Sequence, residues 1–292
     1  MSKLNELKHS VATLANSKGG GHATKEARIK TASDFAKTMY QLGYQIRSVS
    51  QIRVTHLKAY SQSLQNRGLS PRTIANRLSH IRAALSSAGK AAMVKEPAAQ
   101  NSALGVAGGS RIGTKTAMNE SLFSEIKAAL AQKGEGFAAI AELQRALGLR
   151  QQEALRGANT DTLTQWQQQL ADGYARVSLG TKGGRSRETI VHSYARAVLA
   201  VKNSLSIAVQ QGGYVLQADN YKQALNNLNN AYRSAGMKGE FSSHSLRYAW
   251  AREQMSHYRA LGLSERQARA ELSKDLGHGD GRGRYVAMVY LR

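Results

Sequence analysis

The sequence predicts a mainly helical protein with two domains and one small β-hairpin. Only two prolines occur in 292 residues, and residues that favour helices, such as Ala, Leu, Gln, Lys and Arg, are abundant. Apolar residues recur every three or four positions along most of the chain, as in amphipathic helices. One stretch alternates with the period of a strand. A chain of this length can form two hydrophobic cores.

We expect residues 1–88 to form a small helical domain. Its expected helices share an apolar stripe and cover residues 3–15, 25–42, 54–67 and 71–85. Ser70 is suited to cap the last of them, and Pro71 then takes the first helical position, where no N–H is needed. The other faces of this helix carry basic and polar side chains, namely Arg72, Thr73, Arg77, His80 and Arg82, of which the four other than His80 are the candidate DNA contacts. Such a helix is either an ordinary amphipathic helix with a solvated face or one laid against DNA, with arginines on phosphates.

The net charge favours DNA. The chain has 41 Lys and Arg against 19 Asp and Glu, a net charge of +22. A field of this sign attracts a polyanion, and nucleic acid is the first candidate. A membrane surface is the competing partner, but the sequence shows neither an apolar run of membrane-spanning length nor a signal peptide. Structural RNA-binding proteins are equally basic, so charge alone does not imply an enzyme. The absence of cysteine excludes disulfides, zinc–thiolate sites and thiol nucleophiles.

Residues 89–116 lose the helical period and are dominated by Gly, Ala and Ser, which predicts a flexible linker. Residues 117–292 then form the second domain. Its expected helices cover residues 120–130, 136–147, 194–210, 221–235 and 264–276. Residues 174–179 and 188–191 alternate like strands around a turn at 181–184, which predicts a β-hairpin.

The stretch from Phe241 to Trp250 predicts a helix whose first turns carry two polar side chains on one face. Ser242 or Ser243 can cap it, and His244 and Arg247 lie three residues apart. A lone His-x-x-Arg usually marks a solvated face. Three other parts of the second domain carry polar residues that could act together with His244 and Arg247.

Arg150 lies at a helix-to-helix junction, with Glu153 one turn later to orient it; the alternative is a surface Arg–Glu pair. Lys182 lies at the hairpin tip, where a solvated turn lysine is the ordinary interpretation. His278 ends a helix, and Tyr285 and Tyr290 follow it.

These residue types suit a metal-free attack on a phosphodiester. Arg150 and Arg247 match phosphate oxygens bidentately. His244 and His278 can donate hydrogen bonds or move protons, and Lys182 can protonate the leaving oxygen. A phenol beside two guanidiniums is a reasonable nucleophile. No metal-binding motif is visible, so we expect no metal and no cofactor. The product would be a covalent 3′-phosphotyrosine, which conserves the bond energy and needs no ATP.

Residues 25–292 resemble the tyrosine recombinases of the phage integrase family. Five motifs carry the resemblance, in the order of that family: Leu69-Ser-Pro-Arg-Thr-Ile74, Gly148-Leu-Arg150-Gln-Gln-Glu153, Lys182 on a hairpin, His244-Ser-Leu-Arg247 and Leu276-Gly-His278. Each motif is weak alone, but five in order are specific. The resemblance implies a helical SAM-like core-binding domain followed by a mixed α+β catalytic domain.

The position of the nucleophile departs from the family pattern. It usually lies nine residues after the Leu-Gly-His histidine, where this chain has Ala287. Tyr285 comes two residues early and Tyr290 three residues late. An insertion within Gly279–Gly283 would restore Tyr290, and Val289 matches the apolar residue that usually precedes the nucleophile. We expect Tyr290, with Tyr285 as the alternative.

The resemblance implies a site-specific recombinase that integrates or excises a mobile element. It also implies a homotetramer that exchanges strands between two double-stranded DNA sites. We expect a cytoplasmic, nucleoid-associated protein of bacteria with no membrane partner. One alternative is a DNA-binding relative that has lost strand exchange, which the shifted tyrosine suggests. Another is a type IB topoisomerase, which would relax supercoils as a monomer.

Overall fold

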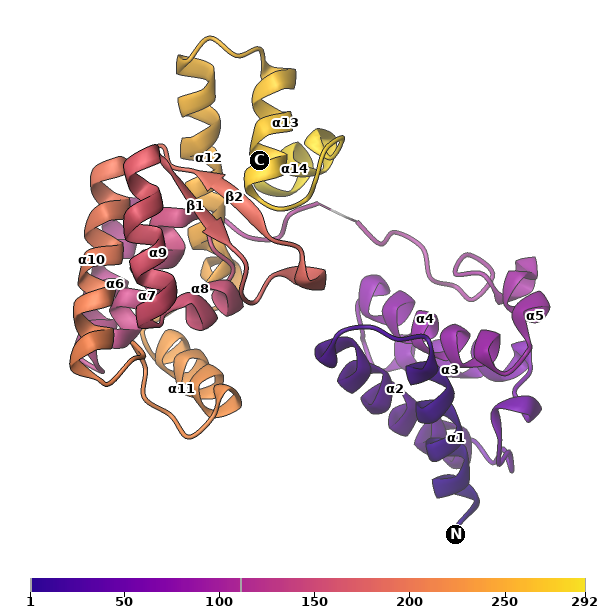
Figure 1. Cartoon of the computed structure of the whole chain (residues 1–292). Coiled ribbons are helices and arrows are strands. Elements are labelled where there is room, and N and C mark those ends of the chain that lie inside the picture. The colour runs from indigo at the N-terminus through magenta and orange to yellow at the C-terminus, as the bar shows by residue number, and fades with distance from the viewer. Residues whose placement is uncertain (1, 111, 292) are drawn as a thin grey trace. The chain divides into compact units, whose positions relative to one another are not determined.

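The computed structural model of the chain describes residues 2–110 and 112–291. It divides the chain into two compact units, Met1–Ser110 and Arg111–Arg292 (Figure 1). Both units are mainly helical, and the sheet in the described part of the chain has two strands. The predicted fold class is therefore confirmed. No helix within the described residues is both long and apolar enough to cross a membrane.

The first unit is a helical bundle. Its α-helices are α1 (Lys3–Ser17), α2 (His22–Gln41), α3 (Val54–Asn66), α4 (Pro71–Ser87) and α5 (Ala91–Lys95), with short 3₁₀ turns η1 (Val49–Gln51) and η2 (Pro97–Ala99). The start of α4 is as predicted, because the Ser70 hydroxyl accepts a hydrogen bond from the Thr73 N–H at 3.3 Å and Pro71 takes the first helical position. The apolar stripes of α1 to α4 meet in one core that contains Phe35 and Leu78.

Part of the expected linker is folded onto this first unit. Residues 91–99 form α5 and η2, and Ala99, Leu104 and Val106 are buried in the same core. This folding was not predicted, because two very short helical turns bury only isolated apolar residues and leave no helical period in the sequence.

The second unit contains nine described α-helices and the hairpin. The helices are α6 (Glu120–Ala131), α7 (Glu135–Leu147), α8 (Gln151–Gly157), α9 (Thr160–Gln169), α10 (Tyr194–Gln210), α11 (Tyr221–Ser234), α12 (His244–Ala260), α13 (Glu265–Asp275) and α14 (Gly283–Tyr290). The short 3₁₀ turns η3 (Leu170–Asp172) and η5 (Gly239–Phe241) precede β1 and α12. Helix α9 was not predicted, because it buries only Leu163 and Trp166 in a run of Thr and Gln.

Strands β1 (Tyr174–Val177) and β2 (Arg187–Ile190) pair antiparallel, with Tyr174 opposite Ile190. The 3₁₀ turn η4 (Lys182–Gly184) forms the tip between them. Alternate residues of both strands are buried, so one face of the hairpin packs inward. That inward face includes a charged residue, Arg187.

Helices α12, α13 and α14 share a hydrophobic cluster of their own. It is built from Trp250, Leu272, Leu276, Val286 and Tyr290, among others. Helix α13 also packs against β2, and α12 packs against α7. This C-terminal group of helices therefore lies directly beside both the hairpin and the α7–α8 junction, where the predicted site residues converge.

Candidate active site

The junction of α7 and α8 fixes Arg150. Gly148 ends α7 in the left-handed conformation, with a φ of 60°. A Cβ there would lie 2.5 Å from Trp250 Cδ2, so glycine also allows α7 to pack closely on α12. Arg150 then precedes α8; its N–H donates to Glu153 Oε2 at 2.8 Å, and its guanidinium donates to Glu153 Oε1 at 2.6 Å.

Arg247 is buried in the first turns of α12, with none of its side chain exposed. Its guanidinium donates to the backbone carbonyls of Gly148 and Leu276. Arg150 also donates to the Leu276 carbonyl, at 3.2 Å. The Leu276 carbonyl, at the end of α13, therefore orients the guanidinium groups of both Arg150 and Arg247.

The start of α12 differs from the prediction in one detail. Ser243 precedes the helix, but its side chain does not cap it; the hydroxyl donates to Gln151 Oε1 at 3.5 Å instead. Leu246, Ala249 and Trp250 face the core as expected.

Glu153 and Arg187 form a buried ion pair next to Arg150 and Arg247. Arg187 donates to both carboxylate oxygens of Glu153, at 2.8 and 2.9 Å, and its Nε donates to the Asp275 carbonyl at 2.6 Å. Burial acts to raise the pKa of Glu153, but Arg187, Arg247 and Arg150 together lower it to about 2. The alternative of a surface Arg150–Glu153 pair is therefore wrong, because Glu153 is fully buried.

Arg187 was not predicted as a site residue. A usable signal was present, because the alternation of β2 places position 187 on the same side as the buried Thr189. A charged residue at an inward strand position needs a buried partner of opposite charge. Glu153, already predicted to orient Arg150, is that partner.

Both predicted histidines lie beside the arginines as neutral rings. Burial, and then the charges of Arg247 and Arg150, lower the pKa of His244 to about 4 and that of His278 to about 3. Each imidazole is therefore uncharged at neutral pH, and each retains one nitrogen that can accept a proton.

Tyr290 lies within this cluster. Its side chain is buried, and its hydroxyl lies 3.1 Å from His278 Nε2. The Arg247 guanidinium is 6.0 Å from the centre of the Tyr290 ring, and the His244 ring is 5.8 Å away. Tyr285, also on α14, is partly exposed and contacts the His278 ring edge-on at 5.0 Å.

Lys182 is the one predicted catalytic residue that is exposed to solvent. It is exposed on η4, at the tip of the hairpin. The structure thus brings together five of the six predicted catalytic residues, namely Arg150, His244, Arg247, His278 and Tyr290.

The four DNA-binding candidates on α4 have different environments. Arg72 and Thr73 are exposed at the start of the helix. Arg77 is paired with Asp34 at 2.5 Å and lines a hollow of about 300 Å³ between α2 and α4. His80, from the polar side of the predicted helix, lines the same hollow, as do Lys30 and Asn76, which were not predicted.

Arg82 has a different role from the one expected. Its Nε and one terminal nitrogen donate to the Ala99 carbonyl at 3.0 and 2.6 Å, and the other terminal nitrogen donates to Asn101 at 2.8 Å. These bonds attach the segment after α5 to the bundle. Because all three guanidinium nitrogens of Arg82 donate within the first unit, its position does not support the predicted contact with DNA.

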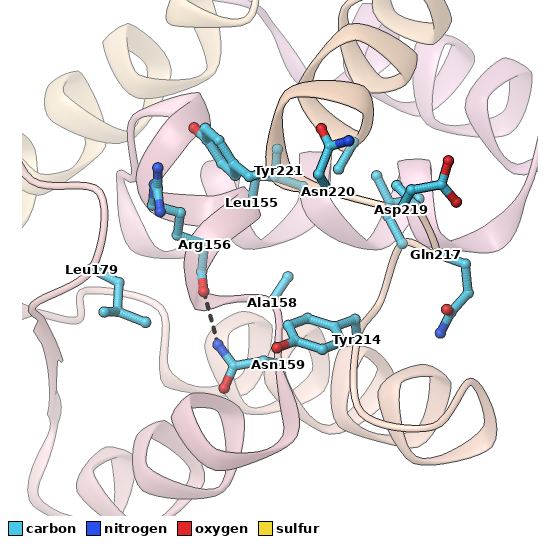
Figure 2. A pocket seen from close by; sticks show the side chains of 13 residues that line it. Leu155, Arg156, Ala158, Asn159, Leu179, Tyr214, Gln217, Asp219, Asn220 and Tyr221 are labelled. Atoms are coloured by element: carbon cyan, nitrogen blue, oxygen red, sulfur yellow. Dashed lines mark hydrogen bonds between the residues drawn. The ribbon is translucent and has the colours of Figure 1, made fainter. Parts of the chain in front are cut away.

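A larger hollow of about 470 Å³ lies in the second unit, between α8 and the segment that leads into α11 (Figure 2). Arg156 stacks on the Tyr221 ring at 3.7 Å, and its carbonyl accepts a hydrogen bond from Asn159. None of the predicted catalytic residues lines this hollow. It is therefore separate from the cluster around Tyr290.

Comparison with known proteins identifies the family. Residues 105–253, slightly more than half of the chain, match the family described as integrase. Residues 1–94 match the family described as phage integrase, N-terminal. No curated protein matches the chain.

Solved structures of recombinases share the fold at low identity. The Tn1549 transposon integrase, in complex with transposon right end DNA, is 14% identical; the match covers 96% of this chain and 94% of that chain, with a TM-score of 0.62. A lambda integrase tetramer bound to a Holliday junction is 15% identical, with coverage of 96% and 78% and a TM-score of 0.57. XerH recombinase bound to difH substrate is 14% identical, with coverage of 98% and 92% and a TM-score of 0.54. This chain belongs to the integrase family of tyrosine recombinases.

Proposed function

We propose that this protein is a site-specific DNA recombinase that cuts DNA with Tyr290 and rejoins it to a new partner strand. The observation that carries the proposal is the contact between the Tyr290 hydroxyl and His278 Nε2, at 3.1 Å, beside the two aligned arginines. A phenol, a proton acceptor and two phosphate-binding forks are the groups that the reaction needs in one place.

In the proposed step, the Tyr290 oxygen attacks the phosphorus of a phosphodiester. The bond from phosphorus to the 5′-oxygen breaks, which leaves a 3′-phosphotyrosine and a free 5′-hydroxyl. His278 accepts the phenol proton, because its Nε2 lies 3.1 Å from the Tyr290 hydroxyl. Arg150 and Arg247 stabilise the negative charge that spreads over the phosphate oxygens in the transition state. Attack by a 5′-hydroxyl from another strand reverses the step and reseals the DNA.

Lys182 supplies the proton for the leaving 5′-oxygen. It lies on a turn whose two glycines, Gly183 and Gly184, take left-handed φ values of 79° and 73°. We infer that this turn moves when DNA binds and brings Lys182 toward the 5′-oxygen. A lysine that approaches two guanidiniums has its charged form disfavoured, which makes it a better proton donor.

The first unit is proposed to be the core-binding domain, and the second the catalytic domain. In the first unit, Arg72, Thr73 and Arg77 would contact DNA phosphates together with Lys30 and His80. The described relatives were solved on DNA, and the lambda integrase structure is a tetramer on a Holliday junction. By analogy we propose a homotetramer on two double-stranded sites that integrates or excises a mobile element in the bacterial cytoplasm.

Covalent trapping tests the proposal. The protein is mixed with a nicked duplex that carries the end sequence of its element, and the products are separated on a denaturing gel. Wild type should give a protein–DNA adduct, Tyr290→Phe should give none, and Tyr285→Phe should match wild type. Loss of the adduct in Tyr285→Phe alone would move the nucleophile to Tyr285. No adduct from wild type, on DNA that it binds tightly, would favour a DNA-binding protein without strand exchange.

A further inference from the structure

The segment that opens the second unit lies against the helix that carries Tyr290. This segment, Ile112–Met118, follows directly after the boundary between the two compact units. The Gly113 N–H donates to the Met288 carbonyl in α14 at 3.2 Å. The contact is therefore made two residues before Tyr290, by main-chain atoms on both sides.

Gly113 allows this contact because it has no side chain. A Cβ at this position would overlap the Val289 carbonyl oxygen and would lie 2.6 Å from the Tyr248 hydroxyl oxygen. The φ of Gly113 lies outside the left-handed region, so any residue could adopt the backbone conformation. The requirement for glycine is thus one of space alone.

The groups that a Cβ would meet are neighbours of the nucleophile. Val289 precedes Tyr290 in the chain, and the Tyr248 ring lies 4.8 Å from the Tyr290 ring. A methyl group at position 113 must push the segment and the last turn of α14 apart. Because the Tyr290 hydroxyl lies only 3.1 Å from His278 Nε2, a small movement of this turn breaks that contact.

The other end of the segment is fixed to the start of α12. The Thr116 N–H donates to the Glu240 carbonyl at 3.2 Å, and the Thr116 hydroxyl donates to the Glu240 carboxylate at 2.6 Å. The Met118 N–H donates to the Ser245 carbonyl at 3.3 Å, and the Met118 side chain is buried. The segment therefore spans from α14, which carries the nucleophile, to the helix that carries His244 and Arg247.

We propose that Ile112–Met118 positions Tyr290 for attack, with Gly113 as the positioning residue. The inference rests on the proposed function, in which Tyr290 is the nucleophile. It goes beyond that function because it assigns a part of the reaction geometry to the connection between the two units. A displacement of about 1 Å in a reacting group can reduce a rate about 10²-fold.

The test compares Gly113→Ala with Gly109→Ala. Gly109 is a matched control, because its φ also lies outside the left-handed region and a Cβ there meets nothing within 4 Å. Adduct formation is measured in a single turnover at saturating nicked duplex, and DNA affinity is measured separately. We expect Gly113→Ala to form adduct about 10²-fold more slowly than wild type with unchanged affinity. Gly109→Ala should match wild type in both measurements.

A second readout does not depend on cleavage. The ¹⁵N resonance of His278 Nε2 reports its contact with the Tyr290 hydroxyl, and Tyr290→Phe provides the signal without that contact. The Gly113→Ala resonance should shift toward the Tyr290→Phe position, and the Gly109→Ala resonance should remain at the wild-type position. If wild type forms no adduct, the proposed function fails, but this readout still decides the role of Gly113.

Identical adduct rates and identical His278 resonances in Gly113→Ala and Gly109→Ala would overturn the proposal. If Gly113→Ala does not fold, Thr116→Val replaces it, because this change removes the hydroxyl bond to Glu240 without adding bulk. Slower adduct formation at unchanged affinity and a shifted His278 resonance are then expected. Wild-type behaviour of Thr116→Val in both readouts would count against the proposal.

Discussion

The two terminal nitrogens of Arg187 donate hydrogen bonds to the two carboxylate oxygens of Glu153, at 2.8 and 2.9 Å, inside the second unit. The pair connects β2 to the start of α8, and the third nitrogen of Arg187 bonds the Asp275 carbonyl. The same carboxylate holds Arg150. The orientation of a phosphate-binding arginine therefore depends on a residue of the hairpin that is not expected to touch the phosphate itself.

Replacing Arg187 with leucine should destabilise the protein and slow adduct formation. The change removes one partner of a buried ion pair, which costs about 3–5 kcal/mol. Arg187→Lys should lose less stability, but it cannot restore the two parallel hydrogen bonds. Urea unfolding measures the stability. Arg185→Leu, at an exposed position two residues earlier, is the control; equal stability of the two leucine variants would refute the role given to Arg187.

Asp275 should make the protein less stable as the pH rises from about 4 to 6. Burial raises the pKa of Asp275 to about 6 from its ordinary value of 3.8, although the Tyr258 hydroxyl donates to its carboxylate. A raised carboxyl pKa means that the folded state binds the proton more tightly, so stability falls between these two pH values. The loss is roughly 3 kcal/mol.

The check is the difference in unfolding free energy between wild type and Asp275→Asn across this pH range. That difference should change between pH 4 and 6 and remain constant above pH 7. Other carboxyls contribute equally to both proteins and cancel in the subtraction. A difference that does not vary with pH would show that Asp275 does not titrate as described.

Lys182→Met should block cleavage of ordinary DNA by removing the proton donor for the 5′-oxygen. General acid catalysis contributes about 10²–10⁴-fold, so a loss of this size is expected. A duplex with sulfur in place of the bridging 5′-oxygen should restore the rate, because a thiolate leaves without a proton. Lys133→Met, at another exposed lysine, serves as control. A sulfur substrate that gives no rescue would argue against Lys182 as the acid.

Arg72→Ala should weaken DNA binding, whereas Arg82→Ala should reduce the stability of the protein. Arg72 is exposed, so its loss should reduce the slope of log affinity against log salt by about one. Arg82 is bonded to Ala99 and Asn101, so its loss should leave the slope unchanged and cost about 1–3 kcal/mol of stability. Salt titrations of DNA binding and urea unfolding of both variants measure these effects. If Arg82→Ala also reduced the slope of log affinity against log salt, Arg82 would be a DNA contact after all.

Much of the fold was predictable because its signals are local. The predicted helix over residues 194–210 agrees with α10, and the cap at Ser70 is formed as expected. Apolar period and capping chemistry act over a few residues, so they can be read without knowledge of distant contacts. The five ordered motifs identified the family in the same way.

Tertiary structure alone decided how the site is assembled. Leu276 lies 126 positions from Arg150 in the chain, yet its carbonyl aligns Arg150 and Arg247 together. Every residue has a backbone carbonyl, so the sequence does not show which one will accept these hydrogen bonds, and no motif could predict that role. The contact of Tyr290 with His278 likewise depends on where the loop after α13 returns the chain, and the role of Arg187 depends on a strand packing against a helix. Residue types and their order determined the available chemistry, whereas long-range packing determined which groups meet.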